Sequence, residues 1–165
     1  MGNIAEKLSP KNQSIEFNKP TLSKEELVTV LDCLVEDMLS SGVITDRFEK
    51  DFKSTFKLRN VISANSLTSA YHLALTALGI ADNDPVLLST YAPHAALDAI
   101  LMLRAKPILV DLGKSSFHMD VEEFNHRVEE LYPKAILVDH AFGCLLDLKK
   151  YNTKDETVEH TQKMP

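Results

Sequence analysis

A hydroxyl-rich turn near the middle of the sequence has the composition of an anion-binding corner. Val61–Ala64 consists of small or β-branched residues, as in a buried strand, and Ser66 can cap the helix that follows. Ser66 and Thr68 also offer hydroxyl groups as donors. A strand that leads into a helix N-terminus directs several backbone N–H groups, and the positive end of the helix dipole, at one point. The turn therefore favours an anion, commonly a phosphate, although a plain capped helix would show the same residues.

Further candidate groups stand directly after apolar runs that have the character of strands. Tyr91 follows Pro85–Ser89 and could stack on a flat ring, although a partly buried loop aromatic is the simpler interpretation. Asp111 and Asp139 end two other apolar runs and could hold a substrate or a cofactor nitrogen, but ordinary loop carboxylates occupy the same positions. His140 could line a pocket, yet a lone histidine is more often structural.

Several kinds of site are not indicated. The six histidines show no metal-ligand spacing, and Cys33 and Cys144 form neither a CxxC pair nor a disulfide framework. No Walker A motif is present, and no G-x-G-x-x-G follows a strand. We therefore predict no metal site, and the residues alone identify no catalytic group.

Composition indicates a folded protein in a reducing compartment. The 165 residues are 44% hydrophobic and 25% charged, enough to bury a core, and the net charge of −6 argues against nucleic acid as a partner. No signal-peptide pattern and no membrane-spanning run is recognised, so we expect a cytoplasmic protein without a membrane partner.

Helix signals come first along the chain. Ser23 and Glu26 form a capping box that predicts a helix with an apolar face, ending near Gly42. Thr45 is predicted to cap a second helix. Its aromatic stripe is interpreted as core packing and comprises Phe48, Phe52 and Phe56.

Apolar runs then alternate with helical patterns. Because these runs lack polar residues, they favour burial on both faces and predict an α/β fold, a three-layer open, largely parallel sheet with helices on both faces. Ligands bind such sheets beyond the carboxyl ends of the strands. We expect an arm over 1–20, a domain over 21–148 and a disordered tail over 149–165. The predicted strands are 61–64, 85–89, 107–111 and 135–139, and the predicted helices are 67–78 (ended by Gly79), 95–104 and one from Asp120 to just before Pro133.

Several segments together resemble the opening part of a known enzyme family. Asn65-Ser-Leu-Thr-Ser-Ala70 and His72-Leu-Ala-Leu-Thr-Ala-Leu-Gly79 are similar to its "NSGTAAL" and "HLAL-ALGI" blocks. Ala105-Lys-Pro-Ile-Leu-Val-Asp111 is similar to "GAKPVFVD", and Val138-Asp-His-Ala-Phe-Gly143 to "PVHLYG". The family is the sugar aminotransferases of the DegT/DnrJ/StrS type, pyridoxal-phosphate enzymes of fold type I, and the resemblance covers about residues 15–150.

The resemblance implies roles for individual residues. Ser66, Leu67 and Thr68 would cradle the phosphate of pyridoxal phosphate, and Tyr91 would stack on its pyridine ring. Leu67 stands where the family has glycine, which allows close approach of the backbone; the Leu67 N–H remains available.

The resemblance also implies what the whole enzyme does. It would transfer an amino group from an amino acid, usually glutamate, to a nucleotide-linked keto sugar, as a dimer whose sites use both chains. The family's aspartate partner of the pyridine nitrogen and its Schiff-base lysine follow the "HLYG" block, and no lysine here stands in a matching motif. We expect an N-terminal portion of such an enzyme, inactive alone. The alternatives are a non-catalytic assembly module that pairs with a C-terminal half or a full-length relative, and a remnant of a truncated gene.

Overall fold

The computed structural model describes residues 21–151, and the chain divides into two compact units, Met1–Val61 and Ile62–Pro165. The sequence prediction of one domain over 21–148 did not contain this division. The predicted arm, 1–20, lies outside the described residues. No helix in the described part of the chain is both long and apolar enough to cross a bilayer.

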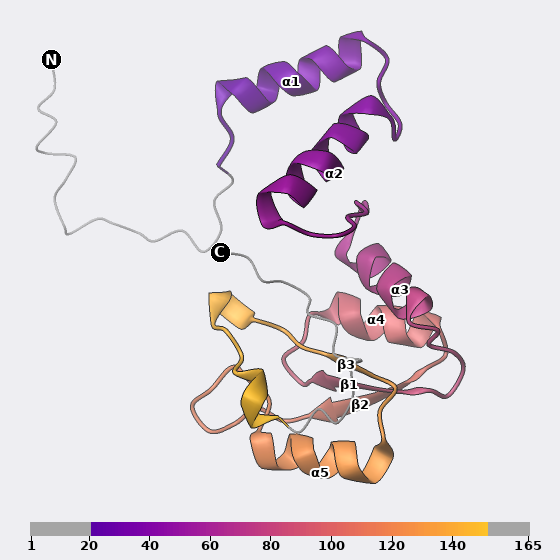
Figure 1. Ribbon diagram of the computed structural model, residues 1–165, viewed down its shortest axis with the longest axis vertical. Helices are drawn as coiled ribbons and strands as arrows, with labels where there is room; N and C mark the ends of the chain where they lie inside the picture. Colours follow the sequence, from indigo (N-terminus) through magenta and orange to yellow (C-terminus); the bar gives the residue numbers. More distant parts are fainter. Residues whose placement is uncertain (1–20, 152–165) are drawn as a thin grey trace, which may run out of the picture. The chain divides into compact units, whose positions relative to one another are not determined.

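The first unit contains two helices, α1 (Lys24–Val35) and α2 (Val43–Phe56) (Figure 1). The capping box is confirmed, because Ser23 Oγ accepts from the Glu25 N–H and the Glu26 carboxylate accepts from the Ser23 N–H at 2.7 Å. The prediction that Thr45 caps the second helix is wrong. Gly42 is the cap residue, and its carbonyl accepts the first ladder hydrogen bond from the Asp46 N–H at 2.9 Å, so that Thr45 lies inside the first turn.

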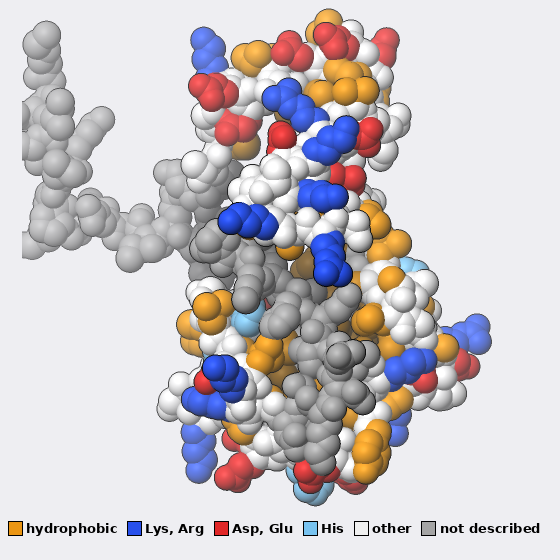
Figure 2. Space-filling model, in the orientation of Figure 1, with side chains coloured by type: hydrophobic (Ala, Val, Ile, Leu, Met, Phe, Trp, Pro, Cys, Tyr) orange, Lys and Arg blue, Asp and Glu red, His pale blue; other side chains and the backbone are white. Residues whose placement is uncertain are grey.

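The aromatic stripe of α2 is present but incompletely buried. Phe52 contacts Phe48 and Phe56, with ring centroids 5.8 and 4.5 Å away. Phe48 is nevertheless 54% exposed, and neither α1 nor α2 contains a buried residue. Hydrophobic side chains accordingly appear among charged ones over these helices in Figure 2. The predicted core packing is therefore only partial, because two helices by themselves enclose little volume.

The second unit is built on a three-stranded parallel sheet with the order β2-β1-β3. Leu87 in the central strand lies opposite Ile108 on one side and Ile136 on the other. The elements are α3 (Leu67–Ala77), β1 (Pro85–Ser89), α4 (His94–Met102), β2 (Lys106–Val110), α5 (Val121–Leu131), β3 (Ala135–Leu137) and two short 3-10 helices, η3 (Ala141–Gly143) and η4 (Leu148–Lys150).

Helices cover both faces of this sheet, so the predicted three-layer α/β architecture is confirmed (Figure 1). Val86 and Leu88 of β1 pack into one buried cluster with α3 and α4, whereas Leu87 points into the other, beside α5. Burial on both faces does not hold at the edge. Leu109 of β2 is 49% exposed, and β2 is an edge strand of the described sheet.

The predicted strand over Val61–Ala64 is wrong. The segment has no regular structure, and Ile62 is 80% exposed. A strand requires a neighbour to complete its hydrogen-bond ladder, and no strand in the described residues pairs with this segment. Its composition suits a strand, but composition supplies no partner.

The packed unit extends further toward the C-terminus than the expected boundary at residue 148. Lys149 and Lys150 belong to η4, and Tyr151 is buried. The Tyr151 hydroxyl donates to the Met119 carbonyl at 2.7 Å, and its ring packs edge-on against Phe124 with centroids 4.8 Å apart. The rest of the expected tail, 152–165, lies outside the described residues.

Hydrogen bonds join the elements at the amino ends of the strands. Lys134, just before β3, donates its ammonium group to Asp84 Oδ2 at 2.6 Å and to the Gly79 carbonyl at 2.7 Å. The Ala81 N–H also donates to Asp84 Oδ2, at 2.7 Å. The hydrogen bonds from Lys134 and then from Ala81 hold the pKa of Asp84 below its ordinary value of 3.8.

This lowered pKa predicts an acid-dependent loss of stability. The contribution of Asp84 is present above pH 3.8 and is lost as the pH falls through the lower folded-state pKa. Asp84→Asn should therefore flatten the pH dependence of the free energy of unfolding between about pH 5 and pH 3, measured by urea unfolding. Asp82→Asn, in the same exposed turn, is the control, and equal pH dependence in Asp84→Asn and the parent would contradict the expectation.

Candidate functional site

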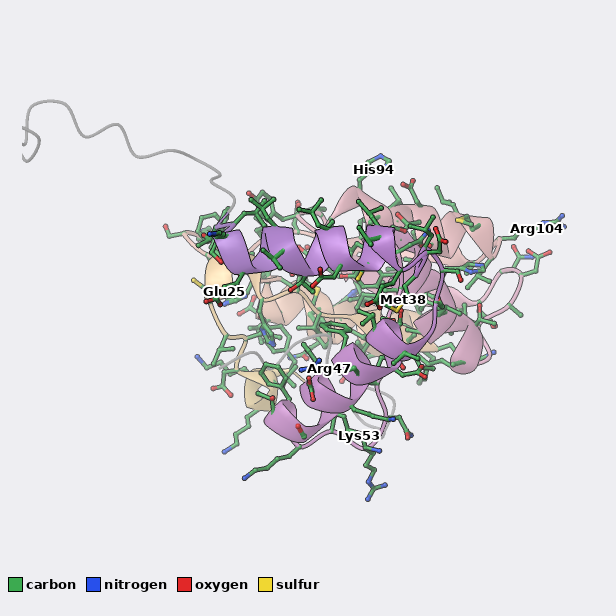
Figure 3. All side chains as sticks on the ribbon, turned by 90° about the horizontal axis from the view of Figure 1, so that it is seen from above. Glu25, Met38, Arg47, Lys53, His94 and Arg104 are labelled. Atoms are coloured by element: carbon green, nitrogen blue, oxygen red, sulfur yellow. The ribbon has the colours of Figure 1, made fainter. Side chains whose placement is uncertain are left out.

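The N-termini of α3 and α4 lie toward the carboxyl ends of the strands. The C-terminus of α3 lies at the amino ends of the strands, because Lys134, just before β3, contacts the Gly79 carbonyl. The C-terminus of α4 lies at the same ends, since the Asn83 N–H, just before β1, donates to the Arg104 carbonyl at 2.9 Å. Figure 3 labels His94, the first residue of α4, and Arg104, which follows the C-cap residue Leu103. Each helix therefore runs antiparallel to β1, and α3, roughly 16 Å long, spans about the length of that strand.

The predicted start and end of α3 are confirmed. Ser66 is the N-cap, its Oγ accepting from the Ser69 N–H at 3.1 Å, and Gly79 follows the helix with φ +72°. Tyr71 and Leu75 of this helix are buried, whereas Leu67 and Ala70 are exposed.

Two backbone donors remain at the start of α3. Ser66 Oγ accepts a hydrogen bond from the Ser69 N–H. Within residues 21–151 the N–H groups of Leu67 and Thr68 have no acceptor. The first N–H groups of a helix have no carbonyl partner inside it and carry the positive end of its dipole. Leu67 is 53% exposed. The corner thus retains the donors that an anion needs.

Loss of the Ser66 cap has a defined expected effect. Ser66→Ala removes the acceptor of the Ser69 N–H, so the free energy of unfolding should fall by about 1 kcal/mol. Urea unfolding followed by circular dichroism measures it. Ser66→Asn, which can still cap, should recover most of the loss, and an alanine variant as stable as the parent would show that the cap contributes nothing.

Tyr91 lies at the carboxyl end of β1 in a group of aromatic rings. Its side chain is 47% exposed, and its ring centroid is 5.9 Å from that of Phe117 and 6.2 Å from that of Phe142. Phe117 lies in the connection after β2, and Phe142 lies in η3, after β3. Three segments that follow three strands thus meet at one edge of the sheet.

The other polar candidates have mainly structural partners. The Asp111 carboxylate accepts from the Thr90 hydroxyl at 3.2 Å, which ties the ends of β1 and β2 together. His140 Nδ1 accepts from the Leu146 N–H at 3.1 Å, so the ring supports the turn around η3. Asp139 is partly buried, and nothing in the structure gives it a ligand-binding role. These contacts favour the simpler alternatives considered from the sequence.

The comparison with known families decides the relationship of this chain. The profile of the DegT/DnrJ/EryC1/StrS aminotransferase family matches residues 20–156. The chain belongs to this family. The resemblance found in the sequence is thereby confirmed.

Members with names and structures extend the comparison. GDP-perosamine synthase of Vibrio cholerae is 29% identical over 147 residues, which cover 88% of this chain and 39% of the synthase. The solved structure of NtdA from Bacillus subtilis with bound PMP has a TM-score of 0.66 and 29% identity over 78% of this chain and 30% of its own. A further match is the PMP form of Spr1654 from Streptococcus pneumoniae, described as a putative sugar aminotransferase. Its TM-score is 0.76 at 24% identity, the match covers 84% of this chain and 35% of that one, and it shows the fold.

The chain of this DegT-family member matches only part of its relatives. It spans between 34% and 39% of the lengths of five curated relatives that it matches. The matched part is the N-terminal portion of the family.

The described residues form a further cleft that has no assigned role. It encloses about 420 Å³ between Gly113–Glu122 and Leu145–Tyr151, and neither Tyr91 nor the start of α3 lines it. His118 Nδ1, in its wall, is buried without a hydrogen-bond partner in the described part of the chain. No group of three or more histidine, cysteine or acidic side chains within residues 21–151 is arranged to bind a metal ion.

Sequence reasoning missed Phe117 and Phe142 as neighbours of Tyr91. Each stands a few residues after a strand end, as Tyr91 does, and a search for aromatic residues in such positions would have selected both. Only the strand order β2-β1-β3, with Tyr91 just after the central strand, brings the three rings together.

Proposed function

We propose that this chain forms the N-terminal part of the major domain of a pyridoxal-phosphate-dependent aminotransferase that acts on nucleotide-linked keto sugars. Family membership supports the reaction class, and a relative named GDP-perosamine synthase supports a nucleotide-linked sugar as the substrate class. The observation that carries the proposal is the pair of donors at the start of α3, at the same edge of the sheet as the half-exposed Tyr91.

The residues present fit two parts of the cofactor. The N–H groups of Leu67 and Thr68 would donate to its phosphate, and the Thr68 hydroxyl would add a third donor. Ser66 keeps its capping role and holds the first turn in place. Tyr91 would lie against the pyridine ring and orient it. When bound, pyridoxal phosphate supplies the electron sink that transamination requires.

The 165 residues are proposed to be inactive alone. No lysine among them stands in a motif that matches the family's cofactor-binding lysine. That lysine also moves the proton at the substrate α-carbon, so its absence removes the proton carrier as well as the covalent link. Incubating the purified protein with pyridoxal phosphate, glutamate and a nucleotide-linked keto sugar should give no amino-group transfer, and robust turnover would refute this part of the proposal.

Binding of the cofactor phosphate can be tested without turnover. PMP, pyridoxamine phosphate, carries an amine in place of the aldehyde and does not react with surface lysines. We expect saturable binding of PMP in an NMR titration, about ten- to a hundredfold tighter than that of pyridoxamine, which lacks the phosphate. Inorganic phosphate should compete. Equal affinity for PMP and pyridoxamine, or no binding of PMP, would contradict the proposed site.

Leu67 gives a sharper test of the phosphate corner. Leu67→Gly restores the residue that the family has at this position and removes bulk beside the donors, so PMP affinity should rise several-fold. The control is Leu73→Gly, because Leu73 is equally exposed (52%) on the same helix but lies away from its N-terminus. A rise in both variants would show that the effect comes from helix flexibility and not from the corner.

A second candidate function is assembly with another chain, and the first unit favours it. α1 and α2 bury no residue, and Leu27, Leu31 and Val35 are all more than half exposed. The occupant that we propose for these faces is a second copy of this chain or a complementary C-terminal part. Sedimentation of the pure chain, alone and mixed with the C-terminal part of a relative, distinguishes the two, and a monomer in both samples would exclude assembly. The cytoplasmic location stays a prediction.

A further inference from the structure

Three aromatic rings form a compact group at the carboxyl edge of the sheet, which we call the aromatic cluster: Tyr91, Phe117 and Phe142. The Phe117 and Phe142 rings pack edge-on, with centroids 5.0 Å apart and planes at 66°. Both rings also contact Tyr91, at 5.9 and 6.2 Å and with similar tilts of 41° and 43°. The Tyr91 ring is therefore in contact with two aromatic rings that also contact each other.

The aromatic cluster is not a buried core. Tyr91 is 47% exposed, Phe117 48% and Phe142 68%, whereas the hydrophobic clusters on the two faces of the sheet contain residues exposed by 9% or less. Exposed aromatic groups that contact one another are typical of surfaces that bind ligands.

The backbone of Phe142 adds an independent observation. Phe142 has φ +54° and ψ +24°, inside η3, a left-handed conformation that is uncommon for a bulky side chain. Such a conformation costs free energy and persists where surrounding structure requires it. Seven non-glycine residues in the described part of the chain have a positive φ, Tyr132 among them, and Phe142 is the one whose ring meets those of Tyr91 and Phe117.

We infer that Phe117 and Phe142 are positioning residues that hold the Tyr91 ring in the orientation needed to stack on a planar heteroaromatic ring bearing a phosphate. The inference rests on the proposed function, in which that ring is the pyridine of the cofactor. The two phenylalanines act through Tyr91: they limit rotation of its ring, while about half of its surface remains open to the ligand. Without them Tyr91 would sample several rotamers, and stacking would have to restrict that motion.

The variants Phe117→Leu and Phe142→Leu test this. Each keeps an apolar side chain but removes the flat contact with Tyr91. The probes are PMP, inorganic phosphate and GDP, titrated by NMR against the full chain. Phe48→Leu is the matched control, because Phe48 is similarly exposed (54%) and contacts another phenylalanine in α2. Circular dichroism and the urea midpoint verify folding.

We expect each variant to bind PMP about three- to tenfold more weakly than the parent, with a smaller ring-current shift of the PMP methyl group. Affinity for inorganic phosphate should not change, and this separates ring orientation from general damage to the fold. Unchanged PMP affinity and ring-current shift in both variants would overturn the inference and leave the proposed function intact. Failure of the parent to bind PMP would overturn both, and GDP binding in its place would make a nucleotide the occupant of the aromatic cluster.

Discussion

Replacing Tyr151 by alanine is expected to lower the free energy of unfolding of the Ile62–Tyr151 segment by about 3–5 kcal/mol. The change removes a buried ring that packs on Phe124, itself 1% exposed, and leaves a cavity between η4 and α5. It also removes the donor to the Met119 carbonyl. Urea unfolding followed by circular dichroism measures the loss as a lower midpoint.

Two further variants separate the contributions. Tyr132→Ala should have little effect, because Tyr132 is 81% exposed. Tyr151→Phe keeps the ring and deletes only the hydroxyl, so it should cost about 1–3 kcal/mol through the unsatisfied Met119 carbonyl. If Tyr151→Ala were as stable as Tyr132→Ala, the segment after η3 would not belong to the packed unit.

The same residue predicts behaviour at high pH. Burial, and secondarily the negative charge of Asp120, raises the pKa of the Tyr151 phenol above its ordinary value of 10.0. A raised pKa means that the contribution of this phenol is fully present below pH 10 and is lost as the pH rises through the higher folded-state value. Tyr151→Phe should remove this alkaline loss relative to the parent.

Replacing Tyr91 by alanine is expected to weaken PMP binding by on the order of tenfold or more, because stacking on an aromatic face is lost. Tyr91→Phe preserves the ring and should bind within about twofold of the parent. An NMR titration provides both affinities and the ring-current shift of the ligand, which should disappear only in the alanine variant.

Stability and the phosphate site serve as controls for this result. Tyr91 is half exposed, so its loss should change the urea midpoint far less than that of Tyr151. Affinity for inorganic phosphate should stay constant, since the donors belong to the start of α3. Full PMP affinity in Tyr91→Ala would refute the stacking role and leave the phosphate corner as the binding group.

The sequence predicted local features of the fold with good accuracy. The capping box at Ser23, the cap at Ser66 and the left-handed end at Gly79 are all confirmed. The helix start predicted at Asp120 is confirmed, since α5 begins at Val121 and the Asp120 carboxylate accepts from the Glu122 and Glu123 N–H groups. The Glu123 carboxylate accepts from the Asp111 N–H and so joins α5 to the end of β2. Such caps depend on residues within four positions of each other, which a pattern can specify.

Features that depend on distant partners were decided by the tertiary structure. Val61–Ala64 has the residues of a strand and no partner strand, whereas Pro85–Ser89, equally apolar, lies between two neighbours. Tyr151 stands in a polar stretch and is buried only because Phe124 and Met119 lie beside it.

The candidate site likewise has features that the sequence predicts and features that only the tertiary structure determines. The sequence by itself determined the family, the hydroxyl turn at Ser66–Thr68 and the role expected of Tyr91, because these reside in contiguous motifs. Only the parallel sheet decided that Phe117 and Phe142 lie against Tyr91. Residues up to 51 positions apart come into contact there, because the carboxyl ends of parallel strands meet at one edge and each following loop starts from that edge.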